Sequence, residues 1–391
     1  MITNSLIQKC CGCQACRNIC PQQCISMEAD NEGFLYPKID YAKCINCNLC
    51  SKVCLLNASD ANRNNNDVLV MAAKSKNEKD RLASSSGGMF TILAESILSK
   101  GGIVYGVSFS SDFAKVKHTR IDTKEDLYKI RGSKYIQSEI NLSYQQVKKD
   151  LINDKLVLFS GTPCQIAGLS LFLGRKYGKL FLVEIICHGV PSPLLWQNYI
   201  KEIARKYQNP IENVNFRSKR NGWKRFIVSQ ELGLNYLFIP KNEDPFLLMF
   251  LRDYCLRPSC YECVAKEIEV MADISLGDFW GIDDFDSSFN DGKGTSLVIV
   301  RSQKGAELLS FSDDKFIAVK SDIDFVRKNN PAIFKSASYS SKRKSFFDYL
   351  NIHGFKRTKI KYGMPTFKTR IKKVLRKGNN NYGILFTFKN H

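Results

Sequence analysis

The sequence lacks long apolar runs, a secretory signal and the common nucleotide-binding motifs. None of its apolar runs approaches the ~18 residues that a membrane-spanning helix needs. The first residues contain no cationic and apolar segment of the kind that directs secretion. Neither GxGxxG nor a Walker sequence occurs among the 391 residues, so a Rossmann or P-loop cofactor site is not indicated. We therefore expect a folded, cytoplasmic protein.

Acidic residues are fewer than basic ones, and the excess of basic residues is distributed unevenly along the chain. There are 58 Lys and Arg residues against 38 Asp and Glu residues, which gives a formal net charge of +20. Residues 342–391 hold 14 of the basic residues and a single acid, Asp348, and so carry +13 of that charge. Because the excess belongs to the C-terminal tail and no nucleic-acid-binding motif accompanies it, we do not expect a nucleic-acid partner.

Within this tail, residues 366–377 have the pattern of an amphipathic helix. Cations lie opposite an apolar face formed by Phe367, Ile371, Val374 and Leu375. Such a helix can make a peripheral contact with an anionic membrane, dock an acidic electron donor, or pack on the body of the protein. The sequence leaves these three alternatives open.

Cysteine, by contrast, is abundant, and eight of the 15 cysteines form two copies of one spacing, C-x2-C-x2-C-x3-C. The copies are separated by 23 residues and consist of Cys10, Cys13, Cys16 and Cys20, then Cys44, Cys47, Cys50 and Cys54. In two-cluster ferredoxins, three cysteines of one run bind a 4Fe-4S cluster and the fourth binds the other cluster. This predicts a first cluster site of Cys10, Cys13, Cys16 and Cys54. It predicts a second cluster site of Cys20, Cys44, Cys47 and Cys50.

The surroundings of these cysteines also favour a ferredoxin module. The segment between the runs reads as a short β-hairpin with its turn at residues 31–33. Zinc sites usually use two CxxC pairs, and a disulfide framework would imply a secreted chain, so both alternatives are weaker. One departure is that Leu55 follows the second run, whereas Pro21 follows the first.

After a polar linker at residues 58–67, apolar segments predict an α/β body. We expect strands at residues 68–73, 102–109, 116–121, 156–159, 180–186, 225–232, 236–239, 274–276 and 296–300. We expect helices at residues 89–99, 142–152, 165–173 and 192–207. This alternation indicates a mixed sheet with some antiparallel pairs.

Two polar turns in the body are candidate anion sites. Ser84, Ser85, Ser86, Gly87 and Gly88 directly precede the predicted helix at residues 89–99, where unpaired backbone N–H groups favour an anion. A plain serine N-cap explains the same pattern. The second turn places a cation, a hydroxyl and an aromatic ring together in Gly132, Ser133, Lys134 and Tyr135.

Four further cysteines predict a third metal site. Cys164 and Cys187 each follow a buried strand, so parallel pairing of those strands would place both at the carboxyl edge of the sheet. Cys260 and Cys263 supply a CxxC pair. We refer to these four as the third cysteine group. Alternatively, Cys164 and Cys187 are buried apolar residues and the CxxC is a zinc knuckle or redox pair. Cys255, close upstream, is a further possible ligand.

Taken in order, these motifs resemble the coenzyme F420 hydrogenase/dehydrogenase beta-subunit family. The matching stretches are the cysteine runs and residues 85–88, 132–135, 161–165, 187–189, 257–263 and 273–281. The resemblance implies an iron–sulfur flavoprotein in which both polar turns bind FAD and the third cysteine group binds a third 4Fe-4S cluster. The resemblance covers roughly residues 4–300. We expect a ferredoxin domain (1–57), the linker, an FAD and iron–sulfur domain (68–340) and the basic helical tail (341–391).

The expected function follows from the number of electrons that each cofactor carries. A 4Fe-4S cluster transfers one electron, whereas a flavin accepts single electrons and delivers two. We therefore expect an oxidoreductase that takes electrons from a ferredoxin-like protein or partner subunit and reduces a small-molecule acceptor. The alternative is a flavin-free relay subunit of a larger complex. His188 is a candidate hydrogen-bond donor to a cluster sulfur or to the flavin, and Asp278 and Trp280 are candidate residues of the substrate pocket. Packing and turn roles explain all three at least as well.

Overall fold

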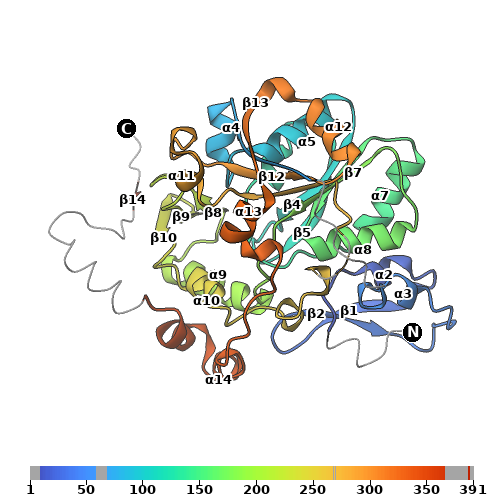
Figure 1. Ribbon diagram of the computed structural model, residues 1–391. Coiled ribbons are helices and arrows are strands. Elements are labelled where there is room, and N and C mark those ends of the chain that lie inside the picture. The colour runs from blue at the N-terminus through green and yellow to red at the C-terminus, as the bar shows by residue number, and fades with distance from the viewer. Residues whose placement is uncertain (1–8, 59–67, 267, 269, 366–385, 388–391) are drawn as a thin grey trace.

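The computed structural model describes residues 9–58, 68–266, 268, 270–365 and 386–387. A small N-terminal module lies beside a larger α/β body (Figure 1). The module packs on helices α7 (Ser143–Ile152) and α8 (Pro163–Leu173) of the body through α2 (Ala15–Ile19) and the short helix η1 (Leu55–Asn57). The two-part architecture predicted from the sequence is therefore present.

The N-terminal module repeats one local structure around each cysteine run. Helix α2 follows Cys13, and helix α3 (Leu49–Lys52) follows Cys47. The residue before each helix, Gln14 or Asn48, has the same left-handed φ of 60°. Between them, β1 (Ile25–Ala29) and β2 (Leu35–Ile39) pair antiparallel, which confirms the predicted hairpin.

The body is organised around an eight-stranded mixed sheet in the order β13-β3-β12-β11-β7-β6-β4-β5. Strands β4, β6, β7 and β11 run parallel, and β5 and β12 flank them in the opposite direction. The bounds are β3 (Leu69–Ser75), β4 (Ile103–Phe109), β5 (Val116–Ile121), β6 (Val157–Gly161), β7 (Leu180–Ile185), β11 (Ile274–Asp278), β12 (Ser296–Val300) and β13 (Phe316–Ser321).

Helices cover both faces of this sheet (Figure 1). Alternate strand residues such as Leu158 pack against one layer, formed by α5 (Met89–Ser99), α6 (Leu127–Ile130) and α12 (Gln303–Ser310). Their neighbours, such as Phe159, pack against α7 and α8. The other elements near the sheet are α4 (Glu78–Ala83), α11 (Ile282–Phe285) and α13 (Ile323–Asn329).

A second core lies under a four-stranded antiparallel sheet, β14-β10-β9-β8. Its strands are β8 (Asn213–Ser218), β9 (Ile227–Leu232), β10 (Asn235–Pro240) and β14 (Phe386–Thr387). Helices α9 (Pro193–Tyr207), α10 (Pro245–Leu251) and α14 (Arg343–Tyr362) pack with it around Trp196. The first part of the segment predicted as a basic tail is thus a helix with buried aromatic residues. Residues 366–377 lie outside the described residues.

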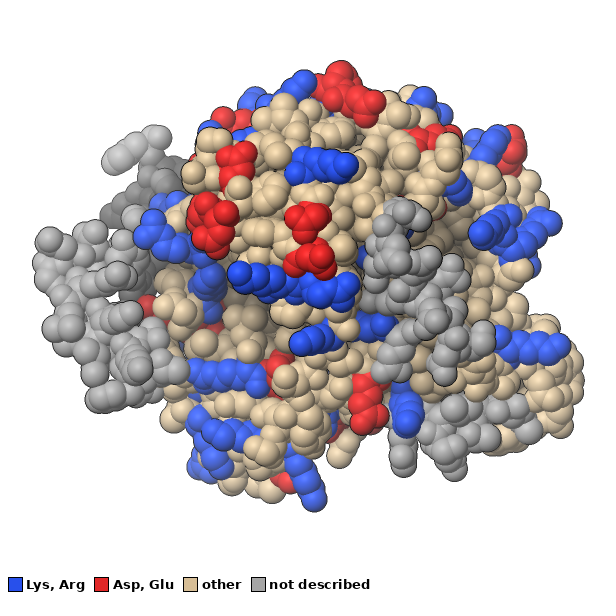
Figure 2. Space-filling model, in the orientation of Figure 1, with Lys and Arg blue, Asp and Glu red and all other residues tan. Residues whose placement is uncertain are grey.

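Charges of both signs are interspersed over the face shown in Figure 2. Surface ion pairs among the described residues include Lys38 with Glu28 and Lys293 with Glu78. In the described part of the chain, no helix combines the length and apolarity needed to cross a bilayer.

Buried His118 makes the stability of the body depend on pH. Its ring stacks on Phe159 with centroids 4.9 Å apart, and Nε2 lies 3.1 Å from the Ser160 carbonyl oxygen. Burial lowers the pKa of His118 to about 4. Between pH 6.5 and 4 the native state therefore binds fewer protons than the unfolded state, and the free energy of unfolding falls as the pH falls.

We predict that His118→Gln, which keeps a hydrogen-bond donor but cannot gain a charge, reduces this pH dependence. Relative to the variant, the wild type should lose about 3 kcal/mol between pH 6.5 and 4. Anaerobic urea unfolding at several pH values measures the difference. Parallel curves for the two proteins would show that His118 does not titrate in this way.

Candidate iron–sulfur and flavin sites

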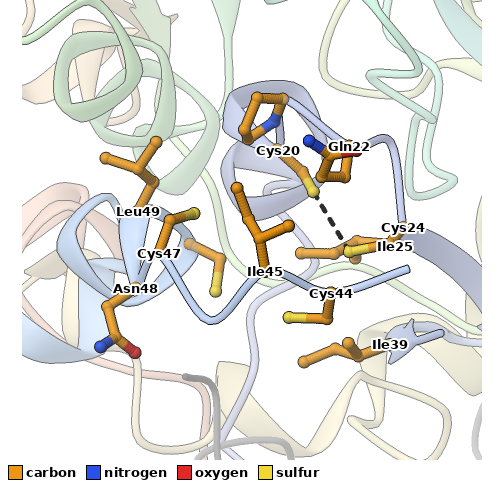
Figure 3. A pocket seen from close by; sticks show the side chains of 12 residues that line it. Cys20, Gln22, Cys24, Ile25, Ile39, Cys44, Ile45, Cys47, Asn48 and Leu49 are labelled. Atoms are coloured by element: carbon orange, nitrogen blue, oxygen red, sulfur yellow. Dashed lines mark hydrogen bonds between the residues drawn. The ribbon is translucent and has the colours of Figure 1, made fainter. Parts of the chain in front are cut away.

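The predicted second cluster site surrounds one small cavity in the N-terminal module (Figure 3). Its lining includes all four predicted ligands, Cys20, Cys44, Cys47 and Cys50. Ile25 and Ile39 close the cavity from the hairpin. The spacing of the two runs thus brings the last cysteine of the first run to three cysteines of the second.

A ninth cysteine, Cys24, also lines this cavity and was not identified from the sequence. Its sulfur lies 3.4 Å from the sulfur of Cys20 (Figure 3). Burial, together with Cys20, raises the pKa of the Cys24 thiol to about 12. Cys24 stands outside the repeated spacing, so no sequence rule identifies it as a ligand.

The cysteines of the predicted first cluster site also lie together. Burial raises the pKa of Cys16, and the neighbouring thiols of Cys10 and Cys54 raise it further. Cys13 is buried between the module and the body. The backbone N–H of Gly12 points at the sulfur of Cys10, 3.3 Å away, which is the kind of hydrogen bond that stabilises a thiolate.

The third cysteine group converges at the carboxyl edge of the large sheet. Strands β6 and β7 pair parallel, with Gly161 opposite Glu184, so Cys164 and Cys187 follow adjacent strand ends as predicted. The loop with the short helix η2 (Pro258–Cys260) brings Cys260 and Cys263 to the same place. Burial raises the pKa of Cys187, and the other three cysteines of the group raise it further.

The donors in this group suit an iron–sulfur cluster better than a packed apolar core. Burial raises the pKa of Cys187, Cys260 and Cys263, and other cysteines of the group raise it further. Such thiols repel one another when ionised and need a cationic centre to stay deprotonated. The Val190 backbone N–H lies 3.5 Å from the sulfur of Cys260, and the Thr162 hydroxyl 3.2 Å from that of Cys164. No three His, Cys, Asp or Glu side chains in the described residues surround a position for one metal ion.

Cys255 does not join the third cysteine group. Its side chain is fully buried in the core around Trp196, next to Leu256. Burial raises the pKa of the Cys255 thiol, and the other residues that act on it do not include a cysteine.

The two polar turns predicted from the sequence lie in contact. The Ser133 backbone N–H donates to the Ser85 hydroxyl at 2.7 Å. Ser86 donates to the carbonyl oxygen of Thr295, which precedes β12. Gly87 is required for close packing, since a Cβ there would lie 2.3 Å from the Ala73 carbonyl oxygen. The turns therefore form one surface at the carboxyl end of β3.

This surface has the features of an anion site. Gly88 begins α5 with a φ of +93°, and no side chain caps the first turn of the helix. Within the described part of the chain, Lys134 donates only to the carbonyl oxygens of Arg131 and Gly132, and burial lowers the pKa of its amine to about 7. A Cβ on Gly132, whose φ is +83°, would meet no atom within 4 Å. Gly132 thus faces open space.

Two cations beside these turns, Arg217 and Lys219, were missed in the sequence. Arg217, in β8, is buried and bonds Asp278 at 2.8 Å and the Tyr135 hydroxyl at 3.2 Å. Among the described residues, its Nε and Nη2 have no hydrogen-bond partner. Lys219 donates to the carbonyl oxygens of Arg81 and Ser86, and burial lowers its pKa to about 7. Their partners are distant in sequence, so no local pattern identifies them.

The remaining sequence candidates have defined partners. Asp278 accepts from Arg217 and from the Trp223 indole N–H, and Trp280 stacks on Trp223 with ring centroids 5.1 Å apart. The half-exposed ring of His188 bonds Asp253 at 2.6 Å, and packs edge-on against Phe250. His188 therefore lies beside the third cysteine group with its Nε2 already paired.

Comparison with known families agrees with this arrangement. Residues 9–58 match the 4Fe-4S dicluster domain. Residues 70–143 and 154–324 match the N-terminal and C-terminal parts of the coenzyme F420 hydrogenase/dehydrogenase beta subunit. The chain therefore belongs to this family of oxidoreductases and carries an N-terminal electron-transfer domain with two 4Fe-4S clusters.

Among solved structures, the chain is similar to one chain of the xenon-derivatised F420-reducing NiFe hydrogenase complex from Methanosarcina barkeri. The two are 21% identical, with a TM-score of 0.48, over 71% of this chain and 91% of the other. No curated protein matches the sequence.

We predict that Cys20, rather than its neighbour Cys24, binds the second cluster. Cys20→Ala should remove about four iron atoms per chain, because one corner of that cluster loses its thiolate. Cys24→Ala should retain them. Iron and acid-labile sulfide, measured after anaerobic purification, separate the two outcomes. Equal losses would mean that Cys24 supports the cluster as strongly as the predicted ligand.

Proposed function

We propose that this protein is an iron–sulfur flavoprotein that carries single electrons from its ferredoxin module to a third 4Fe-4S cluster, FAD and a two-electron acceptor. Cys164, Cys187, Cys260 and Cys263 would hold the third cluster. The polar turns at residues 85–88 and 132–135 would hold FAD. The donor would be a ferredoxin-like protein or a partner subunit of a larger redox complex.

The convergence of the third cysteine group carries this proposal. Its cysteines come from three segments that are far apart in sequence, yet all three meet where α8 contacts the N-terminal module. A zinc knuckle or redox pair would account for Cys260 and Cys263 but not for Cys164 and Cys187 beside them. The same carboxyl edge of the sheet leads to the two polar turns, so cluster and flavin sites would be neighbours.

The residues around the turns fit a dinucleotide with a flavin ring. The uncapped start of α5 and the half-buried amine of Lys134 would attract the pyrophosphate. A flavin ring would find aromatic partners close by, in Tyr135, Trp223 and Trp280. Arg217 offers two nitrogens, Nε and Nη2, that have no hydrogen-bond partner among the described residues. FAD would supply the conversion between one-electron and two-electron transfer. Coenzyme F420, which gives the family its name, is the first acceptor to test.

We predict that Cys260→Ser removes the third cluster and that Cys255→Ala, five residues away in the buried core, retains it. Iron should fall from about 12 to about 8 atoms per chain in the first variant and stay near 12 in the second. Anaerobic reconstitution with iron and sulfide assays measures this. About eight iron atoms in the wild type would mean that the third cysteine group binds no cluster.

Gly132 provides a separate test of the flavin site. Gly132→Ala should weaken FAD retention by about tenfold, equivalent to about 1.4 kcal/mol, because its methyl group enters the open space before the turn. Gly101→Ala is the matched control. Gly101 also has a positive φ, +69°, and open surroundings, but it lies at the opposite end of α5.

Both glycine variants carry a similar backbone strain of about 1 kcal/mol. A difference in FAD retention between them therefore reports on the flavin site and not on strain. Released flavin, quantified after denaturation, is the measurement. If the wild-type chain binds no FAD, the flavin-free relay subunit is the better description. Equal retention in the two variants would place the flavin away from Gly132.

A further inference from the structure

A buried arginine joins the N-terminal module to the loop that carries the third cysteine group. Arg257 lies in that loop, three residues before Cys260, and its side chain is 0% exposed. Its Nε donates to the Cys10 carbonyl oxygen at 2.7 Å, and Nη2 donates to that of Leu35 at 2.9 Å. One side chain thus contacts a cysteine run, the hairpin and the body.

The amide of Gln137 completes this junction. Arg257 Nη1 donates to Gln137 Oε1 at 3.0 Å, and Gln137 Nε2 donates to the Cys11 carbonyl oxygen at 3.0 Å. The run approaches so closely that a Cβ on Gly12 would lie 2.9 Å from Arg257 Nη1. The backbone of residues 10–12 is therefore held by two side chains of the body.

Arg257 carries a buried charge without a carboxylate partner. Its acceptors are all neutral oxygens, and no carboxylate of the described residues lies within ion-pair distance. Other buried arginines here are paired, Arg343 with Glu32 and Arg81 with Asp291. A buried cation is costly unless a negative group compensates it. The Arg257 guanidinium also lies over the rings of Tyr36 and Phe34, 4.2 Å and 5.5 Å from their centroids. Neighbouring thiols and burial raise the pKa of Cys164 and Cys260, and the charge of Arg257 lowers both, so these thiols are the candidates for a compensating negative group.

Sulfur atoms of the two cysteine groups also meet at this junction. Cys11, outside the repeated spacing, packs beside Cys13 and in the same apolar cluster as Cys164, and its thiol raises the pKa of Cys164. On α8, a Cβ on Gly168 would lie 3.0 Å from Cys13 Cβ. The first cluster site is thus packed directly against the third cysteine group.

The second cluster site lies toward solvent instead. Cys47 is exposed, and the nearby side chains of Ile45 and Tyr41 are 60% and 68% exposed. Cys20 follows the helix of the first repeat and Cys54 follows the helix of the second, yet each is predicted to bind the cluster of the other repeat. Because these two helices are also in contact, the two ferredoxin sites are neighbours. An external donor would therefore meet the second site before the first.

We infer that electrons cross from the module to the body between the first cluster site and the third cysteine group, and that Arg257 is the positioning residue whose charge favours the reduced state on both sides. This inference rests on the proposed third cluster. A one-electron reductant is oxidised at the exposed second site, and the electron moves to the first site and then to the third. No bond forms or breaks, and no proton is transferred.

The test compares Arg257→Gln, Arg257→Lys and a control in anaerobic redox titrations followed by electron paramagnetic resonance. Arg257→Gln should shift the midpoint potentials of the two clusters at the junction to more negative values, because a reduced cluster carries one more negative charge. The exposed second cluster should keep its potential. Arg257→Lys retains the charge and should keep the potentials even where it lowers thermal stability.

The control is the double variant Glu32→Gln with Arg343→Gln. It removes another buried contact between the hairpin and the body without changing the net charge. This variant should lower stability and leave all three potentials unchanged. If the role of Arg257 is purely structural, Arg257→Gln at full iron content should also lower stability and leave the potentials unchanged. That result would overturn the inference. Equal shifts in Arg257→Lys and Arg257→Gln would overturn it as well.

Repeating the titrations in a Cys260→Ser background separates this inference from the proposed function. That background retains only the two ferredoxin clusters, and Arg257→Gln should shift the potential of one of them. If the wild type contains only about eight iron atoms, the third cluster is absent and the proposed function fails. A shift that persists in that case would show that Arg257 still acts on the first cluster. If neither ferredoxin potential moves, Arg257 does not act on the first cluster.

Discussion

Parallel pairing of β6 with β7 is the constraint on which the rest of the arrangement depends. It places Cys164 and Cys187 side by side at one sheet edge, which is also where β3 and β11 end. Helix α8 starts from the same edge and presents Gly168 to the N-terminal module. A shift of this pair by one residue would turn the core side chains of one strand to the other face of the sheet and displace the cysteine that follows that strand. Sheet register thus determines both the cysteine group and the docking of the module.

Local patterns in the sequence predicted most of the body. The helix at residues 89–99 and the strands at residues 116–121 and 296–300 have the predicted bounds, because their apolar periodicity is strong and clear turns flank them. Strand β8 was not predicted, since its six residues include only two apolar ones, Val214 and Phe216. Helix α14 was assigned to a basic tail because its charge hid the aromatic residues that pack around Trp196.

The residues of the candidate sites were also predicted only where a local sequence pattern marks them. Spacing alone grouped the ferredoxin cysteines, and strand ends grouped Cys164 with Cys187. In contrast, Arg217 and Lys219 come close to the two polar turns only because β8, which contains Arg217 and ends just before Lys219, packs beside Asp278. That contact joins residues that are distant in sequence. The contacts of Cys11 and Arg257 arise where two modules dock, and no periodicity encodes such a surface. Residues with a local backbone signal were predictable, whereas those selected by long-range packing were not.

The hairpin of the N-terminal module has a mechanical consequence. Gly33 packs against Leu194, Glu32 pairs with Arg343, and the Glu32 carbonyl oxygen accepts from Ser192. These contacts, on the side of the hairpin away from the cysteine runs, brace the module at a second point besides Arg257. A carrier domain that swings on a tether delivers electrons at a pace set by its diffusion. A module that is held at two points stays in place instead. Its rate of electron transfer is then set by the distance between the cofactors and by the driving force, and does not depend on solvent viscosity.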